Sequence, residues 1–312
     1  MSEKTAAAAT QTAQKTTAFK VRDIIFLIMM ILPIAAGIAL KVLYIPASEG
    51  IEISGAHIFF SIDAPIQPLL IGEAQINSWL VIISLFFFCL YMTNGIKQGI
   101  HTKRQVIAEW MVESVENLVD SNMGAYFKSF APFVAAIMAL SAFSSLMSLV
   151  GLFPPTSDLN VVAGWALLVF FLITYYKMKC GPLHYLKSFG EPVPFLAPLN
   201  IISEVATPVS MAFRHYGNIL SGSVISVLVA AGLQGLTKII LGKLPGWLGE
   251  FPFLRIGIPA VLSIYFDIFS GLLQAFIFAM LTMLYVGGAF ALEDYLAMQA
   301  KKKAKTKAKT KT

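Results

Sequence analysis

The fold is decided in the C-terminal third of the chain, where residues 201–233 read IISEVATPVSMAFRHYGNILSGSVISVLVAAGL. Only Glu204 and Arg214 are charged in this segment. Because about 20 helical residues cross the roughly 30 Å hydrocarbon core of a bilayer, the segment is long enough to span a membrane. Residues 256–296 form a second long apolar segment, which carries Asp267 well inside it. The two segments predict membrane-spanning helices that contain charges.

The composition of the whole chain agrees with a membrane protein. Of its 312 residues 57% are hydrophobic and only 13% are charged, about half the charged fraction of a typical soluble protein. Such a chain has too few polar residues to cover a water-exposed surface, which excludes an ordinary cytosolic enzyme. The two cysteines, Cys89 and Cys180, provide no disulfide framework, zinc spacing or redox motif. No metal or cofactor is therefore expected.

Four further apolar segments precede these two, at residues 24–40, 74–96, 129–157 and 159–176. The expected fold is an all-α polytopic membrane protein with about six membrane helices. Its expected divisions are a disordered lead at 1–22, an extra N-terminal membrane helix at 23–45, an external loop at 46–73, the main membrane domain at 74–296 and a disordered, Lys-rich tail at 297–312.

Basic residues indicate the orientation of these helices, since Lys and Arg are enriched in cytoplasmic loops. Eighteen of the 23 basic residues lie before the first span, after the second, after the fourth or after the sixth. The opposite loops are mostly acidic, apart from the last one, which contains Lys238, Lys243 and Arg255. Both termini are therefore expected in the cytoplasm. The basic start of the first segment is also compatible with a signal peptide.

Residues 103–121 have a different pattern, with apolar residues at helical spacing opposite four acids. This pattern predicts an amphipathic helix at the cytoplasmic surface of the membrane. Anionic headgroups would repel the acidic face, which favours a protein partner above it. A face that is simply solvated remains the alternative. The chain has neither a tandem repeat nor the inverted repeat of many transporters.

The charges inside the apolar segments are the strongest functional signal. Arg214 cannot give up its proton in practice, so it needs a water-filled cavity or a counter-charge. Ser210 and Asn218 lie one turn to either side of it and extend one polar face. Asp267, on a different helix, can change protonation, and this combination is the layout of an ion relay. The alternative is that Arg214 forms an ion pair with Asp267 or Glu204 within the chain.

Three strings, PVSMAFRHYGNILSG at 208–222, LLQAFIFAMLTMLY at 272–285 and PPTSDLN at 154–160, together resemble subunit a of the F-type ATP synthase. The resemblance runs from about residue 57 to residue 293. It implies two long, tilted helices that wrap a ring of c subunits. It also implies an essential arginine at Arg214, with Ser210, Asn218 and Gln274 at conserved polar positions and Asp267 at an acidic or histidine position. The sequence departs from some members at Ser223, where they carry a glutamate.

The resemblance implies an ion-conducting stator in a bacterial plasma (inner) membrane, with two half-channels that pass protons or Na⁺ to and from the c-ring. Ions would enter past Asp267, with Ser223 and Gln274 as polar neighbours, and leave near Ser210, Asn218 and Glu204. ATP chemistry would belong to other subunits. The expected partners are the c-ring, peripheral-stalk b subunits at the 103–121 helix and N-terminal helices, and lipid, but no nucleic acid. A secondary transporter with an anion site at Arg214 and a non-conducting membrane anchor are the alternatives.

Overall fold

The computed structural model describes residues 2–45, 55–63, 65, 67–96, 102–182, 185, 189, 194–241, 253–292 and 295–296, with side chains from residue 21 except at 241 and 253–256. The expected Lys-rich tail at 297–312 lies outside these residues. Within the described ranges, six helical segments are long and apolar enough to cross a membrane, as the sequence predicts. They are Val21–Tyr44, Glu73–Thr93, Ala125–Val150, Leu159–Lys179, Pro194–Ile240 and Gly257–Gly288.

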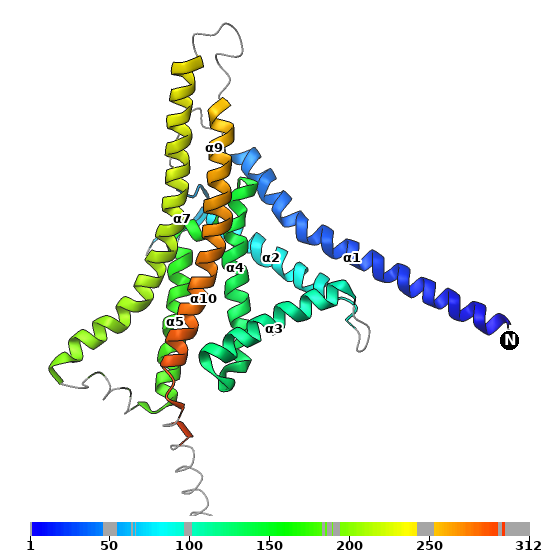
Figure 1. Ribbon diagram of the computed structural model, residues 1–312, viewed down its shortest axis with the longest axis horizontal. Helices are drawn as coiled ribbons and strands as arrows, with labels where there is room; N and C mark the ends of the chain where they lie inside the picture. Colours follow the sequence, from blue (N-terminus) through cyan, green and yellow to red (C-terminus); the bar gives the residue numbers. More distant parts are fainter. Residues whose placement is uncertain are drawn as a thin grey trace, which may run out of the picture.

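The chain is an all-α polytopic membrane protein with one small hairpin (Figure 1). The longer elements are α1 (Ser2–Tyr44), β1 (Ile58–Ile62), β2 (Leu69–Gly72), α2 (Glu73–Thr93), α3 (Lys103–Met123), α4 (Ala131–Leu146), α5 (Leu159–Lys179), α7 (Ala197–Leu241), α9 (Phe253–Ser263) and α10 (Gly271–Gly288). A π-helix, Ile264–Ser270, joins α9 to α10. Short 3-10 helices lie at Ala125–Phe130, Met147–Val150, Pro155–Ser157 and Pro194–Leu196.

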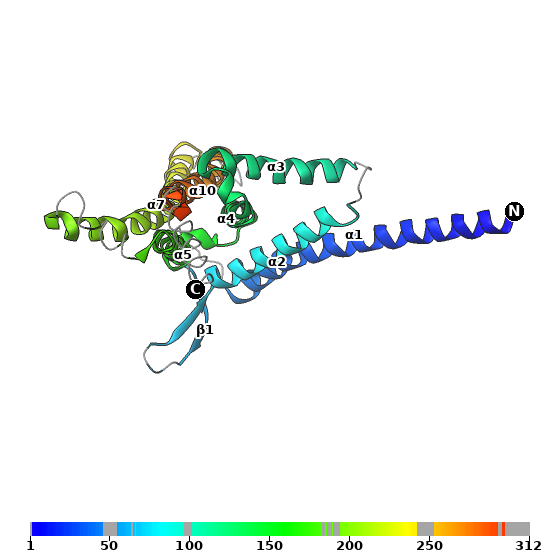
Figure 2. The same ribbon diagram turned by 90° about the horizontal axis from the view of Figure 1, so that it is seen from below.

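Helix α1 begins earlier than expected. Residues 2–22, for which the sequence predicts a disordered lead, are helical and continuous with the first span. The physical reason is composition, because the lead contains a run of alanines, the residue with the highest helix propensity. Figures 1 and 2 both show α1 extending away from the helix bundle to its N-terminus.

Polar contacts fasten α1 to the rest of the chain near both ends of its apolar part. Lys41 Nζ donates to the Gly151 carbonyl at 2.5 Å. At the other end the Asp23 carboxylate lies 3.0 Å from Arg104 Nη1 and accepts from Asn94 Nδ2 at 2.6 Å. Arg104 also donates to the Asn94 carbonyl. These contacts join α1, the end of α2 and the start of α3, so the extra helix is an integral part of the fold.

The expected external loop at 46–73 contains the hairpin, and its residues 46–54 lie outside the described part. Strands β1 and β2 pair antiparallel, and Glu73 N, at the start of α2, donates to the His57 carbonyl at 2.7 Å. Figure 2 shows the hairpin projecting from the start of α2. The expected amphipathic helix is α3, which Thr102 caps by accepting from Gln105 N at 3.2 Å.

The main core lies between α3, α4, α5, α7 and α10. Its fully buried members share an apolar, closely packed environment and include Val119, Val134, Val169, Phe278, Ala279, Met283 and Val286. Two glycines allow close helix contacts. A Cβ at Gly271 would lie 2.6 Å from Ser145 Cβ on α4, and one at Gly222 would lie 3.0 Å from the Phe266 ring. Small residues therefore bring α10 against α4 and α7 against the π-helix.

Helices α7, α9 and α10 carry the candidate site residues. Figure 1 shows α7 bending along its length. Pro208 lies inside α7 and accounts for a bend, because proline lacks the N–H of the helical ladder and its ring collides with the preceding turn. The sequence predicts one helix over 256–296, whereas the structure divides it into α9, the π-helix and α10, which ends at Gly288.

Candidate ion-translocation site

Arg214 lies on the outward face of α7. It is exposed, as are Ser210 and Phe213 beside it, whereas the next residue, His215, is completely buried. Among the described residues Arg214 forms no ion pair. The intrachain pair with Asp267 or Glu204, which the sequence leaves open, is therefore not formed. An exposed guanidinium in a membrane helix needs a partner outside this chain or water.

A polar cluster lies one turn beyond Arg214, between α7 and the start of α10. Asn218 Nδ2 donates to Gln274 Oε1 at 3.4 Å, and Ser270 Oγ donates to Asn218 Oδ1 at 3.2 Å. Gln274 is 3% exposed, so these amides meet inside the protein. The sequence identifies Asn218 and Gln274 separately, and the structure brings them together. Ser270 completes the cluster and escaped the sequence analysis because a single serine in an apolar helix carries no distinctive signal.

Asp267 lies within the π-helix, seven residues before Gln274 in the sequence. Its side chain is half-buried. π-Helical turns inside α-helices occur often at functional sites, because the extra residue redirects the side chains. Ser223, in contrast, is exposed on α7 and its hydroxyl donates to the Ile219 carbonyl at 3.1 Å. The structure does not place Ser223 in the polar cluster.

Glu204 lies nearer the start of α7 and has two partners. Lys177 Nζ is 3.0 Å from Glu204 Oε1, and the Tyr185 hydroxyl donates to the same oxygen at 3.0 Å. Burial first, and then the Glu204 carboxylate, raise the pKa of the Tyr185 hydroxyl, so it remains a donor at neutral pH. The sequence suggests neither partner, because both lie on other segments of the chain.

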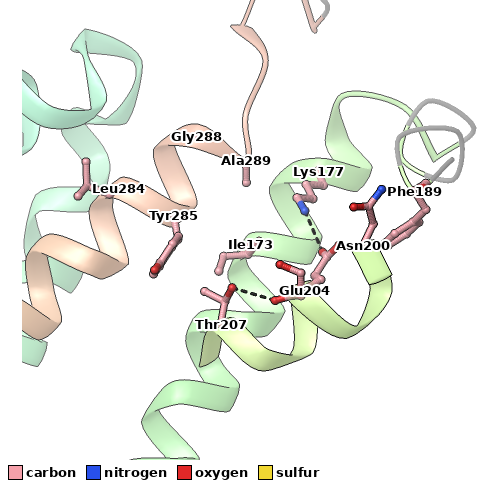
Figure 3. Close-up of a pocket in the computed structure, with 11 residues that line it drawn as sticks. Ile173, Lys177, Phe189, Asn200, Glu204, Thr207, Leu284, Tyr285, Gly288 and Ala289 are labelled. Carbon is pink, nitrogen blue, oxygen red and sulfur yellow. Dashed lines mark hydrogen bonds and ion pairs between the residues drawn. The ribbon is translucent and has the colours of Figure 1, made fainter. Parts of the chain in front are cut away.

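Glu204 and Lys177 border a cavity of about 460 Å³ between α5, α7 and the end of α10. Figure 3 shows Glu204 with Lys177 on one side and Tyr285 facing them from α10. The other polar members of the lining are Asn200, Ser203 and Thr207. The cavity lies at the opposite end of the bundle from Asp267. Asp267 precedes α10, whereas the cavity wall includes Tyr285 near the end of α10. The chain thus has a polar cluster toward one end of the bundle, a cavity toward the other end and Arg214 between them.

The described residues contain no cluster of three or more His, Cys, Asp or Glu side chains able to hold a metal ion. The polar groups are amides, hydroxyls, single carboxylates and two basic side chains, Arg214 and Lys177. This set offers no nucleophile paired with a base. It can exchange protons one at a time and stabilise an incoming negative charge.

Comparison with known proteins gives a consistent result. A family model described as "ATP synthase A chain" matches residues 75–287. ATP synthase subunit a of Geobacter sulfurreducens is 30% identical over 233 residues, which cover 72% of this chain and 92% of the relative. The Legionella pneumophila (strain Philadelphia 1) subunit a is 28% identical over 235 residues, covering 75% and 91% respectively. The Bacillus pumilus subunit a is 34% identical over 200 residues, covering 59% and 78%.

Proposed function

Because the chain belongs to the ATP synthase A chain family, we propose that it is the ion-conducting stator of a rotary ATP synthase. In this proposal it forms two half-channels that open to opposite sides of the membrane and meet the rotating c-ring at Arg214. Its relatives are bacterial, so we place it in a bacterial plasma membrane with both termini in the cytoplasm. Nucleotide chemistry belongs to other subunits of the complex.

The outer half-channel is proposed to run past Asp267 to the cluster of Asn218, Gln274 and Ser270. These groups support it because they are polar, lie close together and continue from the π-helix toward Arg214. A carboxyl group that can gain and lose a proton is suited to pass protons inward. Ser223 lies beside this route on the exposed face of α7 and is proposed to line it only when a ring helix covers that face.

The inner half-channel is proposed to be the cavity beside Glu204. It lies toward the cytoplasmic ends of α5 and α10 in the proposed orientation, and its walls carry Asn200, Thr207 and Tyr285. Ser210 extends the polar face of α7 from this cavity toward Arg214. Protons released from the ring next to Ser210 would reach the cytoplasm by way of Glu204.

Arg214 carries the proposal, because it is an exposed cation between two polar regions and has no ion-pair partner among the described residues. The natural partner for such a group is a carboxylate on another subunit that passes in front of it. Arg214 would attract each ionised ring carboxylate and prevent ions from passing directly between the half-channels. Each proton driven across contributes about 2.3 kcal/mol per 100 mV of membrane potential, so several are needed for each ATP.

The amphipathic helix α3 is the proposed contact for the peripheral stalk. Its first half leaves apolar side chains exposed, with Trp110 66% exposed and Val112 59% exposed, beside the acidic Glu109 and Glu113. A partner with apolar and basic side chains would complement this face. Protons are the proposed ion, with Na⁺ as the alternative, because the ring carboxylate site determines which ion is bound.

The experiment is ATP-driven proton pumping in inverted membrane vesicles that contain the complete complex. Arg214→Ala should abolish pumping while the ATPase activity of the catalytic subunits persists. Lys128→Ala removes another exposed cation, outside the proposed path, and should pump normally. Normal pumping by an assembled Arg214→Ala complex would rule out the proposed role.

A further inference from the structure

A layer of side chains lies inside the bundle, behind Arg214; all are buried except Trp165, which is partly buried. We define the His215 layer as His215 from α7, Phe278 from α10, Trp165 from α5 and Ser141 from α4. The His215 ring centroid lies 5.4 Å from that of Phe278 and 6.0 Å from that of Trp165, both nearly perpendicular. His215 is 0% exposed and Phe278 is 1% exposed. Four helices thus meet at one closely packed point.

The His215 layer lies between the two proposed half-channels. On α7, His215 is eight residues, about 12 Å, beyond Thr207 in the wall of the cavity, and three residues before Asn218 in the polar cluster. On α10, Phe278 lies one turn from Gln274 and about two turns from Tyr285. A proton that moved through the interior of the chain from one region to the other would have to cross this layer.

The chemistry of the layer opposes such a crossing. Two of its four side chains, Trp165 and Phe278, present aromatic rings, and they also contact each other, with centroids 6.3 Å apart. His215 Nε2 lies 3.3 Å from Ser141 Oγ, and within the described residues its Nδ1 has no hydrogen-bond partner. A charged species that entered this packed site would lose its hydration and could gain polar contacts only from His215 and Ser141, which is unfavourable.

We propose that the His215 layer is an internal seal that stops ions from leaking through the stator between its two half-channels. The inference rests on the proposed function, since a seal has a role only where two half-channels exist. It assigns two separate barriers to the chain. Arg214 blocks the route along the ring surface, and the His215 layer blocks the parallel route through the helix bundle.

The test measures the decay of an imposed pH gradient in vesicles that carry the complete complex, after the ring carboxylates have been blocked with a carbodiimide. Blocking the ring stops proton flow that depends on it, so the remaining decay reports routes that avoid the ring. Phe278→Ala should make this decay roughly tenfold faster, since lowering a barrier by about 1.4 kcal/mol changes a rate tenfold. His215→Ala should act in the same direction, and His215→Phe, which refills the space, should be close to the unchanged protein.

Phe276→Ala is the matched control, because it truncates the same residue type on the same helix at a 41% exposed position. The amount of assembled complex is measured for every variant. If Phe278→Ala does not assemble, His215→Ala and the milder Phe278→Leu decide the question. If the variants assemble and the pH gradient decays no faster, the proposed seal is wrong. The same holds if the decay is faster only when the ring carboxylates are left unblocked. If Arg214→Ala stops pumping but the variants of the His215 layer show no faster decay, the proposed half-channels are retained and only the seal is rejected.

Discussion

Glu204 illustrates how single residues acquire their roles from neighbours distant in sequence. It lies on α7, yet its partners are Lys177 at the end of α5 and Tyr185 in the following segment. Its side chain is 10% exposed and that of Lys177 is 31% exposed. The pair therefore lies at the edge of the cavity and is only partly covered by protein.

Glu204→Gln keeps the shape of this side chain and removes its charge. We expect ATP-driven pumping to slow by about three- to tenfold, which corresponds to roughly 1 kcal/mol in the barrier for proton release. The measurement is the initial rate of acidification in inverted vesicles. Lys128→Ala, at an exposed position outside the proposed path, serves as the comparison. An unchanged rate in Glu204→Gln would remove Glu204 from the exit path.

The Tyr185 hydroxyl gives a prediction about pH. Its pKa is raised above the usual value of about 10, so the stabilisation from its bond to Glu204 is complete below pH 10 and declines only as pH rises through the raised value. Tyr185→Phe should therefore lower the thermal stability of the purified complex by the same small amount at pH 6 and pH 8. A difference between the two pH values would contradict this assignment.

At the scale of elements, close helix contacts depend on residues without side chains. The contact between α10 and α4 at Gly271 leaves no room for a Cβ, because one would lie 2.6 Å from Ser145 Cβ. Both atoms belong to rigid parts of their residues, so the helices themselves would have to separate. Separation here would also disturb Gln274, which lies one turn along α10.

Gly271→Ala should accordingly destabilise the assembled chain by about 1–3 kcal/mol, the usual range for overpacking a core. Thermal unfolding in detergent measures this as a lower midpoint. Gly164→Ala adds the same methyl group on α5, where a Cβ would meet nothing within 4 Å, and should not lower the midpoint, because alanine has the higher helix propensity. Equal midpoints for the two variants would show that α4 and α10 are less closely packed than described.

In the proposed orientation, the molecule as a whole separates its charges by membrane face. The hairpin with Asp63 lies on the side where the sequence places the acidic loops, and α3 lies on the side where it places most lysines and arginines. Lys41 of α1 contacts Gly151, and Asp23 contacts Arg104 at the start of α3. These contacts set the direction in which α1 runs relative to the other helices.

Cysteine labelling tests this orientation. In a background of Cys89→Ser, Asp63→Cys should react with a membrane-impermeant maleimide in intact cells, and Asp120→Cys, in the second half of α3, should react only in inverted vesicles. Both positions are exposed, whereas Cys180 is buried at 7% exposure and should remain unreactive. The reverse pattern would place the termini outside and would exchange the two proposed half-channels.

The sequence by itself determined the six membrane helices, because hydrophobic length is a local property that a window of about 20 residues contains. It also singled out Arg214, Asp267, Asn218 and Gln274, since polar residues in apolar segments are conspicuous. Residues 2–22 show where such local interpretation is limited. Their composition suggested disorder, but the high helix propensity of alanine favours the helix that the structure shows.

Only the tertiary structure decided how these residues are used. In the structure Arg214 faces outward and His215 is buried. Asn218 bonds to Gln274 and Ser270, and Glu204 pairs with Lys177. Ser223 lies outside the polar cluster. The physical reason is that contacts between helices depend on the rotation and spacing of each helix, which the close approaches at Gly222 and Gly271 set. No segment contains that information alone, because each contact joins residues that are distant along the chain.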